Sequence, residues 1–515
     1  MAESSVEPIV LGKKGVPLWL QGHTNPTFYP DGDVYDSINP AKPPYNHQRR
    51  AVNDAVKNLT THGFHALFME MGTGKTKTTI DTWMALVKQG RIDTLLVVAP
   101  KTLLSTWTDE ELPKHATIEY GVGHWDGKTT KKSREQFDAL FSHKHIVYVV
   151  NVEGFQSLNE ELRARVSKLL RERKVLMAVD EASTIKGYDA KRSNHIVLAG
   201  ELAKGRMILT GTEISKGPLD LFMQFQFLKP GFWKVKSFYM FRAKYAILED
   251  AYGAGQRTFK KVVGYQKINE LMDTIAPFVT RALKKDCLDL PPKIRQRILV
   301  DLTPSQEKAY GELKKHLATI LESGEILTVE NKISLFTKFR QITGGTIKNG
   351  EAYEVIEQMP EKLKAIIDDV EDTDEQAIIW CAFRGEVQLI AKALAAYGTV
   401  STYDGSTDID DRSEAKVAFQ EGRARFFVSN MKAGSYGLNL QNCHLQYFYS
   451  RDTSPQANWQ AEDRSHRPGQ THPCVYKSLL CRNTVDIRIL DLIEQGSELR
   501  DILRGLSNED MYKII

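Results

Sequence analysis

The sequence is poor in cysteine, and its cysteines follow no pattern of a structural site. Among 515 residues there are five, which form no C-x-x-C pair: Cys287, Cys381, Cys443, Cys474 and Cys481. Disulfide frameworks use an even number of cysteines, and zinc sites use close pairs. The sequence therefore predicts neither a disulfide framework nor a zinc site, and we expect the cysteines to be packing residues.

Long hydrophobic runs are also lacking. No apolar stretch approaches the roughly 20 residues that a membrane-spanning helix needs. The chain starts with MAESSVEPIVLGKKGVPLWL, which lacks the basic start and apolar core of a secretion signal. We therefore expect an intracellular protein without a membrane partner, in the cytoplasm or nucleoid, or in the host cytoplasm if the source is a virus.

An excess of charge of one sign is small. The 69 basic and 65 acidic residues leave a net charge of +4, which permits a nucleic-acid partner without demanding one. With 42% hydrophobic and 26% charged residues, the composition is that of a soluble globular protein and excludes disordered and collagen-like classes. The length is too great for one hydrophobic core, so we expect about two or three domains.

Short apolar runs alternate with longer helical patterns along the chain, which is typical of parallel sheets covered by helices. Two series of strand-like runs stand apart, one at 65–70, 94–100, 145–150, 174–182 and 206–212, the other at 377–383, 399–405, 425–430 and 445–450. The segment between them, from 230 to about 345, reads as mostly helical. The sequence thus predicts two α/β domains joined by a helical region.

The strongest chemical signal is the stretch EMGTGKTKTT, which follows a strand-like run and opens a helical pattern. Gly72 and Gly74 let backbone amides face a phosphate chain. Lys75 can reach the β and γ phosphates, and the Thr76 hydroxyl can bind magnesium. The strict pattern has glycine where this chain has Met69, but the strand-loop-helix setting supports a phosphate-binding loop.

A second signal is the stretch AVDEAS at the end of an apolar run. Asp180 can hold hydrated magnesium, and Glu181 can activate the attacking water. The alternative, a solvated acidic pair at a strand end, loses weight beside an intact phosphate loop. Upstream, Gln48 precedes the first helical pattern, where its amide is placed either to read adenine or simply to lie at the surface.

Two arginines, Arg464 and Arg467, lie three residues apart in the stretch QAEDRSHRPGQ. Phosphoryl transfer builds negative charge on the γ-phosphate oxygens, and an arginine supplied by a separate domain stabilises that charge and makes hydrolysis depend on domain closure. An isolated R-x-x-R would be read as a solvated helix face. In the company of the other motifs, the pair is interpreted as arginine fingers.

The order of these motifs resembles that of the Swi/Snf-type ATPases of helicase superfamily two, from about Pro43 to Arg504. The stretches that carry the resemblance are, in order, PYNHQ, GTGKT, VVAPKTLLSTW, DEASTIKG, LTGTEISKGPLDLFMQFQFLKPG, DLPPK, DLTPSQEKAY, IIWCAF, YDGST, SNMKAGSYGLNL and QAEDRSHRPGQ. At 58.3 kDa the chain is similar to compact members of bacteria and their viruses.

The chain also departs from the family pattern. Ser183 replaces the usual histidine of motif II, and Glu213 replaces the usual proline after LTGT. In motif V, Ser435 and Tyr436 separate glycines that are usually closer. None of these changes removes a group that hydrolysis itself requires.

The resemblance implies a fold of two RecA-like lobes with parallel sheets covered by helices. The expected parts are an N-terminal extension draped over the first lobe (1–42), an ATP-binding lobe (43–230), a helical insertion and linker (231–290), and a second lobe (291–515) with a helical insertion near 303–345.

The resemblance also implies ATP and Mg²⁺ as cofactors. The catalytic residues carried over are Lys75, Asp180, Glu181, Arg464 and Arg467; magnesium ligands are Thr76 and Asp180; and nucleotide contacts are Gln48, Gly72, Thr73, Gly74, Lys75, Thr76, Gly437 and Gln460. The candidate DNA contacts are Lys101, Thr102, Lys186 and Lys432, since lysine, threonine and backbone amides suit phosphates. For these four, solvated surface positions are the alternative.

We therefore expect an ATP-dependent translocase that moves on double-stranded or branched DNA and remodels DNA structures or protein–DNA complexes. One alternative is a strand-separating DNA or RNA helicase of the same superfamily. Another is a non-catalytic DNA-binding scaffold that has kept the fold. The sequence does not identify a protein partner.

Overall fold

The chain folds into two compact units, which we call lobe 1 (Met1–Asp289) and lobe 2 (Leu290–Ile515). The computed structural model describes residues 32–125, 127, 129–157, 159–211, 217–252, 258–322, 327–405, 409–434, 438–497, 499 and 502–503. Most of the predicted N-terminal extension, together with Glu213 and the motif V residues Ser435, Tyr436 and Gly437, lies outside the described residues.

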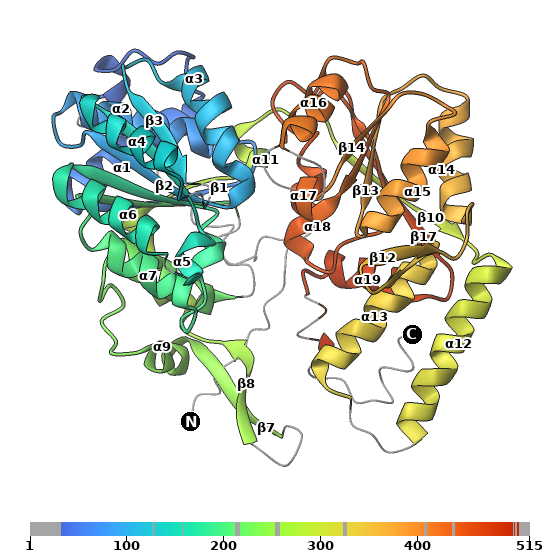
Figure 1. Ribbon diagram of the computed structural model, residues 1–515. Helices are drawn as coiled ribbons and strands as arrows, with labels where there is room; N and C mark the ends of the chain where they lie inside the picture. Colours follow the sequence, from blue (N-terminus) through green and yellow to red (C-terminus); the bar gives the residue numbers. More distant parts are fainter. Residues whose placement is uncertain are drawn as a thin grey trace. The chain divides into compact units, whose positions relative to one another are not determined.

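The core of lobe 1 is a parallel sheet with helices on both faces (Figure 1). In the described part of the lobe its seven strands have the order β3-β4-β2-β5-β6-β1-β9. Several strands are buried at every position, because their apolar runs face helices on both sides. The strands are β1 Phe64–Met69, β2 Thr94–Ala99, β3 Gly121–Trp125, β4 Ile146–Asn151, β5 Val175–Asp180, β6 Gly205–Thr210 and β9 Val279–Ala282.

The helices of lobe 1 connect these strands. They are α1 Asn46–Thr61, α2 Lys75–Lys88, α3 Leu112–His115, α4 Lys131–Ala139, α5 Gly154–Ser157, α6 Glu160–Glu172, α7 Lys191–Gly200, α8 Leu221–Leu228, α9 Phe238–Tyr245, α10 Ile268–Ile275 and α11 Lys284–Cys287. The shorter turns are η2 Val34–Asp36, η3 Lys101–Leu103, η4 Thr106–Glu111, η5 Leu140–Ser142, η6 Ala182–Ile185, η7 Pro218–Asp220 and η8 Ala276–Phe278.

Lobe 2 repeats this architecture around a second parallel sheet. Within its described residues, six strands have the order β10-β17-β16-β13-β15-β14. They are β10 Lys293–Val300, β13 Ala377–Cys381, β14 Val400–Tyr403, β15 Phe426–Asn430, β16 Leu445–Phe448 and β17 Cys474–Cys481. A two-stranded ribbon, β11 Thr346–Asn349 with β12 Ala352–Val355, packs beside α15.

The helices of lobe 2 include a long pair, α12 and α13, that lies at the edge of the lobe (Figure 1). In chain order they are α12 Pro304–Glu322, α13 Val329–Thr343, α14 Glu361–Glu371, α15 Arg384–Leu394, α16 Ile409–Gln420, α17 Met431–Gly434, α18 Pro455–Glu462 and α19 Val485–Glu494. The predicted fold class, two parallel sheets covered by helices, is confirmed.

The region between the two sheets differs from its mostly helical prediction. A hairpin of β7 (Ala246–Tyr252) and β8 (Thr258–Tyr265) projects from lobe 1, and β9 joins the first sheet beside β1 (Figure 1). β9 has the sequence VTRA, which is too short to show an apolar period. Its place is set instead by distant partners: Thr280 donates to Asp54 at 2.8 Å and lies 3.1 Å from the His65 ring. The predicted helices at 303–345 are present as α12 and α13.

Residues at the end of the predicted N-terminal extension pack on lobe 1. The Tyr35 hydroxyl donates to the buried Asp81 carboxylate in α2 at 2.5 Å, and Asp33 accepts hydrogen bonds from Arg49 and Asn53 in α1. Four of the five cysteines are buried and Cys287 is half-buried, and none of the five forms a disulfide. No helix among the described residues is long and apolar enough to cross a membrane.

Candidate functional site

The predicted phosphate loop connects β1 to the start of α2. Gly72 and Gly74 have φ values of 80° and 90°, in the left-handed region that side chains with a Cβ rarely adopt. Thr73 closes the turn between them, because its hydroxyl and amide donate to the Glu70 carbonyl at 2.6 and 3.2 Å. The amides at the start of α2 are thereby turned toward a common point, as anion binding requires.

Lys75 is the first residue of α2, and its side chain is buried. The ammonium donates to the Met69 carbonyl at the end of β1, at 3.0 Å. Gly211, which follows β6, leaves room for this ammonium: a Cβ there would lie 3.3 Å from the Lys75 Nζ atom. The lysine therefore lies directly over the loop that is predicted to hold phosphates.

Gln48 lies against the phosphate loop. Its Nε2 donates to the Thr73 carbonyl at 3.0 Å, while its Oε1 accepts from the Tyr45 amide at 3.1 Å. The His47 ring lies 2.8 Å from the same Thr73 carbonyl, and Gly74 is the residue that leaves space for the Gln48 amide. The Nε2 of Gln48 thus ties the start of α1 to the loop, while its Oε1 caps α1 itself. Its predicted role in reading adenine stays a prediction.

Asp180 and Glu181 lie at the carboxyl end of β5, and both are buried. The Asp180 Oδ2 accepts from the Trp107 indole, and its Oδ1 accepts from the Glu181 amide, both at 2.9 Å. Burial raises the pKa of Asp180, while the Trp107 hydrogen bond and the positive charge of Lys75 oppose that rise. The charge interaction places the predicted catalytic lysine and carboxylate in one site.

Glu181 has a φ of 50°, one of four non-glycine residues in the described chain with a positive φ. This conformation costs roughly 1–3 kcal/mol and is concentrated at functional sites. It turns the backbone between the end of β5 and η6, at the point where the two adjacent carboxylates lie. The geometry suits distinct roles for Asp180 and Glu181.

The residues predicted to hold magnesium offer the ligands that this ion prefers. Asp180 presents carboxylate oxygens and Thr76 presents a hydroxyl at the start of α2. Each Asp180 oxygen accepts a hydrogen bond from the protein and keeps lone-pair capacity for a metal ion. No group of three or more His, Cys, Asp or Glu in the described parts of the chain forms a metal cage. Magnesium bound through one carboxylate, water and nucleotide phosphates needs none.

The two predicted arginine fingers, both in lobe 2, differ in their exposure to solvent. Arg464 is 1% exposed, and its Nε and Nη1 donate to the carbonyls of Gln460 and Leu438 at 2.9 and 3.1 Å. Arg467 is half-buried, with Nε donating to the Asp463 carbonyl at 2.8 Å. Arg464 is therefore held within its own lobe, and Arg467 is the more accessible of the two.

Gln460 is a buried residue of α18, and its Oε1 has no hydrogen-bond partner among the described residues. A buried amide oxygen without a partner is costly, so the atom is a candidate acceptor for a ligand. Gly437, the other nucleotide contact predicted in lobe 2, lies outside the described residues.

Beside the arginines, Glu462 forms a buried ionic cluster that the sequence analysis missed. Its carboxylate lies 3.6 Å from Lys293, 2.6 Å from Arg295 and 3.4 Å from Arg451. Burial alone would raise the pKa of Glu462, but the three cations outweigh burial and hold that pKa below its ordinary value. The cluster anchors the end of α18 to β10 and to the end of β16. Its partners are up to 169 positions apart, so no local signal in the sequence could have found it.

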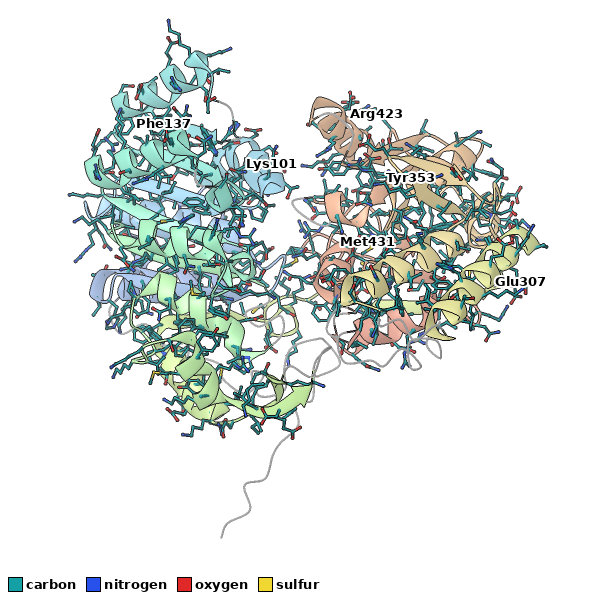
Figure 2. All side chains as sticks on the ribbon, turned by 60° about the horizontal axis from the view of Figure 1, so that its bottom comes forward. Lys101, Phe137, Glu307, Tyr353, Arg423 and Met431 are labelled. Atoms are coloured by element: carbon teal, nitrogen blue, oxygen red, sulfur yellow. The ribbon has the colours of Figure 1, made fainter. Side chains whose placement is uncertain are left out.

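The predicted DNA contacts fall into two groups. Lys101 and Thr102 in η3 are exposed, as is Lys432 in α17, next to the buried Met431 (Figure 2). Lys186 instead pairs with Asp220 at 3.5 Å and is partly covered. Exposure makes the first three available to a partner, and Lys186 would have to share its charge with Asp220.

Family comparisons agree with this geometry. Residues 47–350 match the model of the SNF2-related domain, and residues 358–469 match the helicase conserved C-terminal domain. The chain belongs to the SNF2-related family. It carries the SNF2-related ATPase domain together with the helicase C-terminal domain.

Relatives and solved structures include both remodelling and helicase proteins. "Chromatin structure-remodeling complex subunit snf21" of Schizosaccharomyces pombe is 24% identical over 86% of this chain and 38% of its own length. An "Uncharacterized ATP-dependent helicase" of Mycoplasma pneumoniae is 23% identical over 91% of this chain and 44% of its own length. The chain thus spans less than half the length of these two relatives.

A solved structure, "Sulfolobus solfataricus SWI2/SNF2 ATPase core in complex with dsDNA", is 22% identical to this chain with a TM-score of 0.42. The match covers 93% of this chain and 98% of that chain.

Proposed function

We propose that this SNF2-related ATPase is a translocase that uses ATP hydrolysis to move along double-stranded DNA and to remodel DNA structures or protein–DNA complexes. The observation that carries the proposal is the site in lobe 1, where Lys75 and the Asp180–Glu181 pair come together within an SNF2-related domain. The names of the relatives, which include a chromatin-remodelling subunit and ATP-dependent helicases, support DNA as the partner.

Each residue of the candidate site in lobe 1 has a proposed role that follows from its position. The amides around Gly72 and Gly74 and the Lys75 ammonium bind the nucleotide phosphates, because they present positive charge at the start of α2. Magnesium, when bound by Asp180 and Thr76, neutralises charge on the phosphates. Glu181 orients the attacking water and accepts its proton.

Lobe 2 is proposed to contribute a group that stabilises the charge developing in the transition state. Arg467 is the residue proposed to supply positive charge to the γ-phosphate oxygens, because its partial exposure makes it the more accessible of the two arginines. Arg464, buried among carbonyls of its own lobe, supports the turn after α18 and reaches the nucleotide only if it exchanges these partners.

DNA contact is proposed for the exposed Lys101, Thr102 and Lys432. Lysine and hydroxyl groups bind phosphates without reading bases, so binding should depend strongly on salt and weakly on sequence. Such contacts suit a motor that must hold every sequence it passes.

The experiment is a comparison of ATPase rates with duplex DNA, single-stranded DNA and RNA at equal nucleotide concentration. We expect the largest stimulation by duplex DNA. Stimulation mainly by single-stranded DNA would favour a strand-separating helicase, and a preference for RNA would overturn the DNA assignment. No hydrolysis with any of the three would favour a non-catalytic scaffold.

A further inference from the structure

A tryptophan outside the predicted site touches its metal-binding carboxylate. Trp107 is 1% exposed and donates its indole N–H to the Asp180 Oδ2 at 2.9 Å. It lies in η4, a π-helical turn over Thr106–Glu111. Turns of this kind are rare and are frequent at functional sites. The only signal in the sequence is the tryptophan of the stretch KTLLSTW.

The other end of the same helical run lies at the surface. The run begins in η3 with the exposed Lys101 and Thr102. Leu104 and Ser105, which link η3 to η4, both have right-handed helical backbone angles, with φ of −58° and −65°. One helical element therefore connects the exposed lysine and threonine to the buried indole.

The Asp180 carboxylate is fixed by two hydrogen bonds from different directions. The backbone amide of the next residue, Glu181, donates to one oxygen at 2.9 Å. The Trp107 indole holds the other oxygen from a separate element. Groups that orient a metal ligand in this way commonly change metal affinity or activity by about 10–100-fold when they are removed.

We propose that Trp107 is a positioning residue that sets the orientation of the Asp180 carboxylate and couples it to DNA contact at Lys101 and Thr102. The proposal rests on the proposed function for its DNA half only. Because the helical run is continuous, a displacement of its surface end by a phosphate contact moves the indole, and the indole moves the carboxylate. DNA contact thereby changes how well the site binds magnesium and nucleotide.

Lobe 1 provides a matched control for the packing of a buried tryptophan. Trp83, in α2, is 0% exposed and belongs to the same hydrophobic cluster as Trp107. Its indole nitrogen is buried without a hydrogen-bond partner among the described residues. Replacing either tryptophan with phenylalanine removes a similar amount of ring, but only Trp107→Phe removes a donor from Asp180.

The experiment measures binding of a fluorescent ATP analogue as Mg²⁺ is added, with no DNA present, in Trp107→Phe and Trp83→Phe. We expect Trp107→Phe to need about tenfold more Mg²⁺ for half-maximal enhancement of binding, and Trp83→Phe to behave as the wild type. Thermal unfolding reports the packing loss in each variant. Equal Mg²⁺ requirements in the two variants would overturn the positioning role.

The coupling between DNA contact and the Asp180 carboxylate is tested first in the wild type, so the test does not require a variant that folds. Adding duplex DNA should change the Mg²⁺ concentration for half-maximal analogue binding, and Trp107→Phe should lose most of that change. If duplex DNA binds the wild type without altering its Mg²⁺ requirement, the coupling is overturned. If no DNA binds at all, the proposed function fails, whereas the DNA-free comparison of Trp107→Phe with Trp83→Phe still decides the positioning role.

Discussion

The two lobes share an architecture but place their charged groups differently. In lobe 1 the groups of the candidate site project from loops at strand ends, where a few neighbouring residues determine their geometry: the glycines beside Lys75, and the strained turn at Glu181. In lobe 2 the arginines of the turn after α18 adjoin a buried cluster centred on Glu462. Local sequence thus sets the backbone turns that carry the first set, although the distant Trp107 also holds Asp180. The second set depends mainly on residues far away in the chain.

A second buried cluster in lobe 2 extends this contrast. Lys362 is fully buried and pairs with Asp486 at 2.6 Å, and Asp486 also accepts from the Thr343 hydroxyl at 2.9 Å. Nearby, burial raises the pKa of Glu386 to about 7, although the Ser450 hydroxyl donates to it. Lobe 2 therefore contains two buried groups of interacting charges, and we expect its stability to depend on them.

The largest expected effect follows from replacing the accessible arginine of lobe 2. Arg467→Ala should lower kcat by about 10³-fold or more, because an arginine finger acts mainly on charge that develops in the transition state. Nucleotide affinity should change little. The control is Arg482→Ala, which removes an arginine that pairs with Asp301 at the surface of the same lobe. Equal losses of kcat and affinity in Arg467→Ala would indicate ground-state binding instead.

A slightly smaller effect is expected for the water-activating carboxylate of lobe 1. Glu181→Gln should lower turnover by about 10²- to 10⁴-fold, the usual contribution of a general base. The phosphate loop and Asp180 remain, so nucleotide binding should survive in a direct binding assay. ATPase activity near that of the wild type would show that Glu181 is not the base and that the local geometry of lobe 1 was misread.

The buried cluster of lobe 2 can be broken by removing its central anion, Glu462, which contacts all three cations. Glu462→Gln leaves the buried Arg451 without its counter-charge, whereas Lys293 keeps Asp463 at 2.8 Å. The loss for Arg451 should lower the free energy of unfolding by about 3–5 kcal/mol. Urea denaturation measures this change. The matched change Glu414→Gln, which breaks the exposed pair with Arg423, should change the free energy of unfolding little, because water and salt screen exposed charges. Similar losses in both variants would remove the distinction between buried and surface pairs.

The pH dependence of lobe 2 gives the smallest of these effects. The pKa of Glu386 is about 7 in the folded protein, against an ordinary value of 4.5, so the folded state holds an extra proton between these values. The stability that the wild type gains from binding this proton is fully present below about pH 4.5 and is lost as pH rises through about 7. As pH rises from 5 to 7.5, the free energy of unfolding of Glu386→Gln should therefore increase relative to that of the wild type by up to about 3 kcal/mol. Urea denaturation at each pH measures this difference. A constant difference between the two proteins would contradict the raised pKa.

The same contrast explains how much the sequence could predict. The apolar runs of β1, β2 and β5 mark their strands directly, and the phosphate loop follows from a contiguous motif. β3, β9, β10 and β17 were not among the predicted strands. β9 and β10 each lie at an edge of a sheet, where short or alternating sequences depend on a partner strand for their structure.

The candidate site shows the same limit. Lys75, Asp180 and Glu181 could be named from local motifs, and the structure brings Lys75 and Asp180 together. The contact of Trp107 with Asp180 spans 73 positions, and the Glu462 cluster depends on β10, more than 160 positions away. Pairing over such distances is decided by tertiary packing, which a single sequence does not display.

The central claim, that ATP hydrolysis drives movement along an intact duplex, is tested most directly by displacement of a third strand from a DNA triplex. A motor that follows the backbone of one strand within a duplex should release the third strand when ATP is present, and Glu181→Gln should not. A forked duplex with no strand available for reannealing should stay paired under the same conditions. Unwinding of the fork without displacement of the third strand would contradict the account and favour a strand-separating helicase.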